Sequence, residues 1–263
     1  MDSRKKLSLF EMLKVACLKP SEYKNLLQQS VGKLIGYVAI LVLLTSFATY
    51  GVSMIGFVVG IGGFENLFTN RIPQFQLENG TLTMEHPIEF EIQGIRFVAD
   101  ASKEEVTKSD LSEEYYSEIL ISKHNMIMKN VLQQYEMKFN QTEGLTLNNE
   151  DLVLWIPYIY VTLAFSYAVL YGMSVVEFCF TAMMFILYAF MINLVYQAKM
   201  KKGDLIKVGI YSSTIGVLLV ALNNGFHQII PSILVWFVQI TVTLMFIRMA
   251  IAKNSTLEMI KKS

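Results

Sequence analysis

Three long windows of apolar residues, almost free of charge, alternate with polar segments along the chain. Residues 34–64 and 208–247 contain no charged residue, and residues 152–198 contain only Glu177. A helix needs about 20 apolar residues to cross a bilayer, and a soluble helix is apolar on one face only. These windows are apolar all round, so the pattern predicts an α-helical integral membrane protein.

Charge is distributed unevenly, although the formal net charge is zero. The segment 65–151 carries 16 acidic and 7 basic residues, a net charge of −9. The Lys and Arg residues elsewhere cluster before the first window, after the second window and at the C-terminus. Because Lys and Arg beside membrane segments stay cytoplasmic, both termini are expected inside. The segment 65–151 is expected to be extracytoplasmic.

The number of crossings follows from window length and from these sides. The first window predicts one helix, 33–64, and the third predicts two, hinged at LNNGFHQIIP. The second window has the length of two crossings. Its two ends are expected on opposite sides of the membrane, which requires an odd number of crossings, so we expect one crossing, Ser174 to Ala198. The stretch before it is then re-entrant or interfacial. The prediction is four crossings plus this helix, with five crossings and an outside C-terminus as the alternative.

Tyrosine, tryptophan and proline residues support an interfacial place for that stretch. Aromatic residues favour the headgroup level, and Pro157 favours a bend. The aromatic residues concerned are Trp155, Tyr158, Tyr160, Tyr167 and Tyr171.

The segment Gln74 to His86, QFQLENGTLTMEH, alternates apolar and polar residues on both sides of Asn79-Gly80. This is the pattern of a β-hairpin with a two-residue type I′ turn. The turn places Leu77 opposite Leu82 and Phe75 opposite Met84, all on one buried face.

Further alternating segments predict a small, mostly antiparallel β-rich domain. IEFEI and GIRFVAD meet near Gln93-Gly94, EILISKHNMIMKN folds back around Lys123-His124-Asn125, and QQYEMKF adds a strand. The acidic stretch SKEEVTKSDLSEEYY between them is expected to be helix or loop.

The predicted domain organisation has five parts. They are a cytoplasmic amphipathic arm 1–32, a first transmembrane helix 33–64, an extracytoplasmic β-rich domain 65–151, a helical bundle 152–252 and a cytoplasmic tail 253–263. In the arm, Ser8 and Glu11 form a capping box and Pro20 ends the helix. Two interpretations of the arm stay open: it lies on the inner headgroups, or it packs on the protein as an ordinary helix.

Four segments occur in one order: LKPSEYKN, IPQFQLENGTL, GIRFVADAS and ILISKHNMIMKN. Together they resemble a bacterial membrane-protein family of unknown function that is often labelled maltodextrin-utilisation related. The resemblance covers most of the chain and implies a plasma-membrane protein near a sugar uptake system. KMKKGDLIKVGIYSSTIGVLL is also similar to Yip-type membrane proteins.

No catalytic motif stands out: the sequence has no Walker loop, HExxH, GxSxG or cysteine cluster. We therefore expect no enzymatic activity, cofactor or metal. His86 is near Glu85, Glu89 and Glu91, but a strand splits them between two faces, which favours a solvated acidic edge. His124 is expected in a turn and His227 at the outer hinge.

Glu177 is the most informative residue, because an intramembrane carboxylate is a functional hypothesis by default. It could relay protons or bind a cation, with Asn193, Gln197 or Gln239 as partners. The alternative is that Glu177 lies near a headgroup beside a turn at Gly172-Met173-Ser174. Asn193 and Gln239 are residue types that form hydrogen bonds between membrane helices more often than they bind ligands.

Two functions follow as hypotheses. The first is a non-enzymatic bacterial plasma-membrane protein whose outer β-domain binds or senses an envelope component or partner protein, as an accessory to carbohydrate uptake. The second is a transporter or channel subunit that uses Glu177. The expected partners are membrane lipid and another membrane or envelope protein, not nucleic acid. The sequence leaves the oligomeric state and the ligand open.

Overall fold

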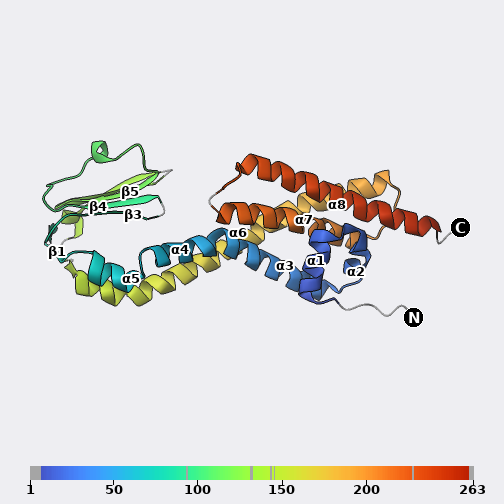
Figure 1. Cartoon of the computed structure of the whole chain (residues 1–263), viewed down its shortest axis with the longest axis horizontal. Coiled ribbons are helices and arrows are strands. Elements are labelled where there is room, and N and C mark those ends of the chain that lie inside the picture. The colour runs from blue at the N-terminus through green and yellow to red at the C-terminus, as the bar shows by residue number, and fades with distance from the viewer. Residues whose placement is uncertain are drawn as a thin grey trace. The chain divides into compact units, whose positions relative to one another are not determined.

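The computed structural model describes residues 7–92, 94–130, 133–142, 144, 146–226 and 228–260. It divides the chain into two compact units: residues 1–53 with 165–263, and residues 54–164. The first unit is a helical bundle and the second holds all eight strands (Figure 1). Within the described residues, four helical segments are long and apolar enough to cross a membrane. They are Val31–Arg71, Asn149–Val195, Lys202–Gly225 and Ser232–Lys253.

The bundle unit begins with the arm. The helix α1 (Leu9–Leu18) starts at the expected capping box, in which the Ser8 amide donates to Glu11 and the Glu11 amide donates to the Ser8 hydroxyl. Pro20 then opens a 3₁₀ turn, η1 (Pro20–Glu22), and α2 (Tyr23–Leu27) follows. The predicted capping box and helix end are therefore confirmed.

The first long helix contains a π-helical turn in its middle. It consists of α3 (Val31–Ser46), the π-turn η2 (Phe47–Gly51) and α4 (Val52–Gly60). A π-turn inserts an extra residue into a helix and occurs often at functional sites. The remaining bundle helices are α6 (Asn149–Val195), α7 (Lys202–Gly225) and α8 (Ser232–Ile260).

The predicted turn at Gly172-Met173-Ser174, and with it the re-entrant helix, is wrong. The helix α6 is continuous from Asn149 to Val195 and contains both Pro157 and Gly172. The Ser174 hydroxyl donates to the Leu170 carbonyl at 2.9 Å, a bond within the helix that a turn would break. A lone glycine lowers helix propensity by only about 1 kcal/mol, which is too little to end a long apolar helix.

The predicted hinge of the third window is confirmed, because α7 ends at Gly225 and α8 begins at Ser232. Asn223 closes this connection: its amide nitrogen donates to the Ile230 carbonyl at 2.9 Å, and the Ile230 amide donates to its oxygen at 3.0 Å. His227, expected at this hinge, lies outside the described residues.

Three glycines let α7 approach its neighbours closely. A Cβ on Gly209 would lie 2.6 Å from the Ile186 side chain on α6, and one on Gly216 would lie 2.5 Å from Cγ of Gln239 on α8. A Cβ on Gly225 would collide with the carbonyl oxygen of Ala48 in η2. The helix α7 is therefore the central helix of the bundle.

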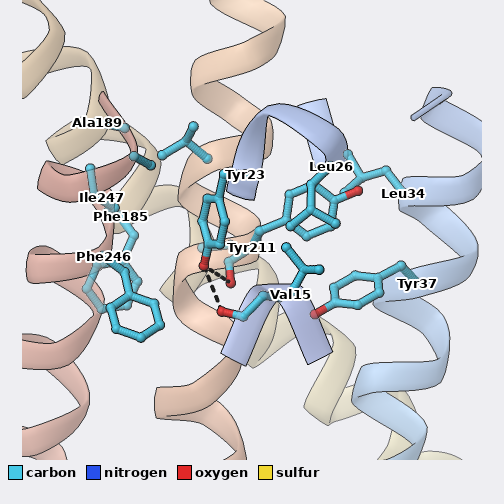
Figure 2. Packing of buried hydrophobic residues seen from close by; sticks show 14 of the residues in the cluster. Val15, Tyr23, Leu26, Leu34, Tyr37, Phe185, Ala189, Tyr211, Phe246 and Ile247 are labelled. Atoms are coloured by element: carbon cyan, nitrogen blue, oxygen red, sulfur yellow. Dashed lines mark hydrogen bonds between the residues drawn. The ribbon is translucent and has the colours of Figure 1, made fainter. Parts of the chain in front are cut away.

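The arm packs into the core of this bundle (Figure 2). Tyr23 is 1% exposed, and its hydroxyl donates to the Ala16 carbonyl at 2.7 Å and the Tyr211 carbonyl at 3.2 Å. The Tyr37 and Thr214 hydroxyls are hydrogen-bonded at 2.7 Å. This packing supports the interpretation of the arm as a packed helix, while Phe10 and Leu18 stay exposed.

The second unit contains two sheets. The three-stranded sheet has the order β2 (Thr81–Met84), β1 (Phe75–Glu78), β8 (Leu147–Asn148). The five-stranded sheet has the order β3 (Ile88–Ile92), β4 (Ile95–Ala99), β5 (Ser117–Ile121), β6 (Asn125–Lys129), β7 (Gln134–Lys138). The short helical turns of this unit are α5 (Phe64–Asn66), η3 (Leu67–Arg71), η4 (Lys108–Asp110) and η5 (Phe139–Thr142).

The predicted register of the first hairpin is confirmed. Leu77 pairs with Leu82 and Phe75 pairs with Met84. Leu77 and Leu82 are buried against Phe139. The other expected hairpins and the additional strand are also present, and Gln93 lies outside the described residues.

The strand pairs are mostly antiparallel, as predicted, and β4 and β5 are the pair that runs parallel. Parallel strands need a crossover of a dozen or more residues, and the acidic stretch between Ala99 and Ser117 supplies it. Asn125 holds this crossover: its Nδ2 donates to the Val106 carbonyl and its Oδ1 accepts from the Val106 amide, both at 2.8 Å. Val106 then packs on Leu120 and Ile127.

Candidate functional site

The bundle unit contains a cavity of about 1020 Å³ between the π-turn η2, the middle of α6, the C-terminal half of α7 and the N-terminal half of α8. Its polar lining includes one carboxylate, Glu177, together with hydroxyl and amide side chains. The hydroxyl and amide residues are Thr45, Ser46, Thr49, Tyr50, Ser174, Thr181, Tyr188, Asn223, Asn224, Gln228, Ser232 and Gln239.

Glu177 lies on the face of α6 that lines the cavity, and its side chain is exposed there. The lining residues of α6 are 174, 177, 178, 181, 184, 185 and 188, which follow the spacing of one helical face. On that face Phe178 and Phe185 are buried, whereas Phe180 and Met183 on the other side are exposed. Because the expected turn at Gly172 is absent, Glu177 occupies the interior of a long apolar helix.

The Glu177 carboxylate has no partner within the described residues. No ion pair or hydrogen bond joins it to the chain, and the described lining of the cavity contains no Lys or Arg. A carboxylate without a partner is costly in an apolar environment. The site therefore presents an uncompensated negative charge to whatever enters it.

Gln239 provides the second unpartnered polar group. It is 8% exposed, lines the cavity, and its amide makes no hydrogen bond within the described part of the chain. Gly216 on α7 lies against its stem and so determines where the amide points. The Gln239 amide is therefore available to bond a ligand in the cavity.

The π-turn brings hydroxyl groups to the same cavity. Ser46 is 2% exposed, and its hydroxyl donates to the Leu43 carbonyl at 3.1 Å and meets the Tyr167 hydroxyl at 3.3 Å. Thr49 and Tyr50 lie within the π-turn itself and line the cavity.

The four intramembrane polar residues expected to act together separate into two groups. Glu177 and Gln239 line the cavity, whereas Asn193 and Gln197 do not. Asn193 accepts a hydrogen bond from the Met200 amide at 3.1 Å, and Gln197 has a positive φ of 48° just after α6 ends. These two residues terminate the helix, so their predicted partnership with Glu177 is not formed.

Basic side chains gather at the end of the bundle where the arm packs. Lys207 donates to the carbonyls of Leu27 at 2.6 Å and Gln29 at 2.7 Å, and Arg248 donates to the Tyr196 hydroxyl at 2.7 Å. The helix α7 runs from this basic end to Asn223 at the cavity. In the arm, burial raises the pKa of the Cys17 thiol to about 11, because the thiolate loses hydration there.

The residues considered for a metal site in the β-rich unit do not converge. Glu89 pairs with Arg96 at 2.7 Å, and His86 lies in the connection between β2 and β3. The described residues contain no group of three His, Cys, Asp or Glu side chains placed to hold a metal ion. His124 lies in the β5–β6 turn, as expected, and contacts Glu104 at 3.2 Å. Hydrogen bonds from Lys123 lower the pKa of Glu104.

Asn79 and Gly80 are structural rather than ligand-binding. Both have positive φ, 52° and 74°, as a type I′ turn requires. A Cβ on Gly80 would also lie 3.0 Å from the backbone of Asn140. The predicted turn is therefore confirmed.

Most of the cavity lining was missed from the sequence. The hydroxyls of Thr45, Ser46 and Thr49 are dispersed in an apolar window and were not singled out from the sequence. The usable signal was periodicity: Ser174, Glu177 and Thr181 recur at helical spacing on one face of α6. No comparable signal identifies Trp236, which lines the cavity from α8.

Comparisons with known proteins give one match, to a family. No curated protein and no solved structure matches the chain. The family profile matches residues 10–251, which include the arm, both compact units and the cavity. The chain therefore belongs to the family described as "Protein of unknown function (DUF1189)".

Proposed function

We propose that this chain is a non-enzymatic membrane protein that binds a ligand in the cavity of its helical bundle, as a receptor or as a transporter subunit. The observation that carries the proposal is that Glu177 and Gln239, from different helices, both face one cavity and both lack a partner in the described chain. Intramembrane polar groups without internal partners mark ligand or ion paths. On this ground we favour the transporter hypothesis over the outer-domain hypothesis.

The proposed setting is the bacterial plasma membrane, with both termini cytoplasmic and residues 65–151 outside. One end of the bundle supports this orientation, because it holds the basic residues Lys207 and Arg248 together with the arm. Positive charge of this kind is expected of the cytoplasmic face. Asn223, at the opposite end of α7, is then on the outer side. The cavity opens toward the outer half of the bilayer in this arrangement.

Native mass spectrometry of the full-length chain, purified in a mild detergent, tests the proposal. We expect the wild type to retain a bound small molecule or lipid and Glu177→Gln to lose most of it. Cys179→Ser is the matched control, because Cys179 is an exposed residue of the same helix and is not one of the residues that line the cavity. Equal retention by all three proteins would contradict a role for the cavity.

The β-rich unit supports a second candidate, the binding of an envelope partner. The observation is that β7 is exposed at all five positions and pairs on one side only, with β6. An exposed edge strand can accept an extended segment of another protein. The expected link to maltodextrin uptake belongs to this candidate, with a component of an uptake system as the partner.

A complementation experiment separates the two candidates. Cells whose own copy is deleted receive the chain with Glu177→Gln, or with Tyr135→Lys and Met137→Lys, which place guarding lysines on the edge strand. Loss of function with Glu177→Gln alone supports the cavity, and loss with the β7 variant alone supports the edge strand. Both side chains on β7 are exposed, so their replacement is compatible with folding.

A further inference from the structure

We propose that the ligand of the cavity is an amphiphile with an organic ammonium group, held by Glu177 and by the aromatic rings around it. The inference rests on the proposed function and names the chemical class of its ligand. The ammonium group could belong to a membrane lipid or to a molecule from the water outside, and the two sources share this chemistry.

The first step of the argument is charge. Glu177 is the single charged residue among the described lining residues, and nothing in the described chain neutralises it. An anionic ligand would meet a like charge and no Lys or Arg. A cation supplies the missing partner, and the pair forms in apolar surroundings where an ion pair is stronger than in water.

The second step is the nature of the cation. Calcium takes six to eight oxygen ligands and magnesium needs an octahedral set, whereas the described lining offers one carboxylate. Aromatic rings, by contrast, surround the cavity from three helical elements. They are Tyr50 of η2, Phe178, Phe185 and Tyr188 of α6, and Trp236 of α8. Faces of aromatic rings attract organic ammonium groups, and this is their best-known use in recognition.

The third step is size and polarity. A cavity of about 1020 Å³ is at the upper end of the range for small-molecule sites, about 300–1,000 Å³. Beside the polar groups it exposes aliphatic side chains, among them Ile233, Val235 and Leu244. The occupant therefore combines a cationic head with a hydrocarbon part. Gln239 also lines the cavity and can bond a polar link in the ligand.

Fluorescence of Trp236 provides a direct measurement. The chain has two tryptophans, so Trp155→Phe leaves Trp236, in the cavity lining, as the sole reporter. The full-length variant is reconstituted in vesicles of neutral galactolipid, which contain no ammonium group. The probes are decyltrimethylammonium and, as its uncharged counterpart, decanol.

We expect decyltrimethylammonium to change the Trp236 emission saturably, and Glu177→Gln to weaken its apparent affinity by about tenfold or more. Decanol should bind more weakly and should not distinguish Glu177→Gln from its parent. Cys179→Ser, on the outer face of α6, is the matched control and should bind like the parent. Glu177→Asp, which keeps the charge, should restore part of the affinity.

The source of the ammonium group is distinguished by two further additions. Choline added to the water tests a free ligand, and phosphatidylethanolamine included in the vesicles tests a lipid headgroup. A saturable response to either that Glu177→Gln abolishes supports the inference and names the source.

Two results would overturn the inference, and they differ in their consequence. If decanol and decyltrimethylammonium bind equally, and Glu177→Gln changes neither, the cavity binds ligands but the ammonium class is wrong. If neither amphiphile alters the Trp236 emission, the binding cavity itself is contradicted and the proposed function fails with it.

Discussion

Gly216 on α7 lies directly against Gln239 on α8: a Cβ on Gly216 would be 2.5 Å from Cγ of Gln239 and 3.3 Å from its Cα. The two helices are in backbone contact here because Gly216 lacks a side chain. The close approach pins the buried stem of Gln239 and leaves its amide at the cavity. The geometry of the candidate site thus depends on a residue that need not touch the ligand.

Gly216→Leu should therefore separate α7 from α8 and displace Gln239. Overpacking of this kind costs about 1–3 kcal/mol. The thermal unfolding of the chain in detergent should shift to lower temperature, and ligand retention should fall. Gly172→Leu is the matched control, since nothing lies within 4 Å of a Cβ there. Equal unfolding temperatures for the two variants would show that the contact is not tight.

The hairpin turn gives a second prediction. Asn79→Val should destabilise the first hairpin, because a β-branched residue resists the φ of 52° observed at Asn79. Hydrogen exchange of β1 and β2 in the full chain should become faster. Thr83→Val places the same residue four positions later, in an ordinary strand of this hairpin, and should have little effect. Unchanged exchange in Asn79→Val would mean that the turn type is wrong.

A third prediction concerns the charged residues of the five-stranded sheet. Arg96 pairs with Glu118 at 2.6 Å, where Glu118 is fully buried, and with Glu89 at 2.7 Å, where Glu89 is exposed. Removing one partner of a buried ion pair costs about 3–5 kcal/mol, whereas an exposed pair contributes about 0–1 kcal/mol. Glu118→Ala should therefore lower the unfolding free energy far more than Glu89→Ala.

Chemical denaturation of the two variants measures this difference. Both substitutions remove a carboxylate from the same arginine, and Glu118→Ala also removes the acceptor of the Ser112 amide at 2.9 Å. Comparable losses in the two variants would show that Glu118 is more hydrated than its zero side-chain exposure indicates.

Sequence reasoning succeeded where local signals agree. Asn79-Gly80 determines the turn, and the alternation on each side then determines the register of Leu77 with Leu82. The apolar windows that become the four long helices follow from composition, and the count of four follows from window length together with the distribution of charge. These features depend on residues close together in the chain.

Sequence reasoning failed where tertiary contacts decide. Nothing local indicates that β4 and β5 run parallel, since the Asn125 side chain that secures the crossover acts through the distant Val106. Glu177 and Gln239 come from helices that only the packing of α7 brings to one cavity. The Asn193 amide was a candidate to bind a ligand. In the structure its side-chain oxygen instead accepts a hydrogen bond from the Met200 backbone amide at the end of α6.

The fourth prediction concerns the sides of the membrane. With four crossings, a cysteine introduced by Ser263→Cys in a chain without Cys17 and Cys179 should stay unlabelled by a membrane-impermeant thiol reagent in intact cells. Thr81→Cys, in the segment expected outside, should be labelled in the same background. Labelling of Ser263→Cys in intact cells would favour the five-crossing alternative and an outside C-terminus.

The most direct test of a ligand cavity inside the bundle is the reactivity of two nearby positions on α6. Thr181 lines the cavity, and Met183 is 49% exposed on the opposite side of the helix. In the background without Cys17 and Cys179, we expect a cationic, membrane-impermeant methanethiosulfonate to modify Thr181→Cys and to leave Met183→Cys unmodified, since lipid covers the latter. Modification of Met183→Cys with Thr181→Cys unreactive would contradict the cavity and the account built on it.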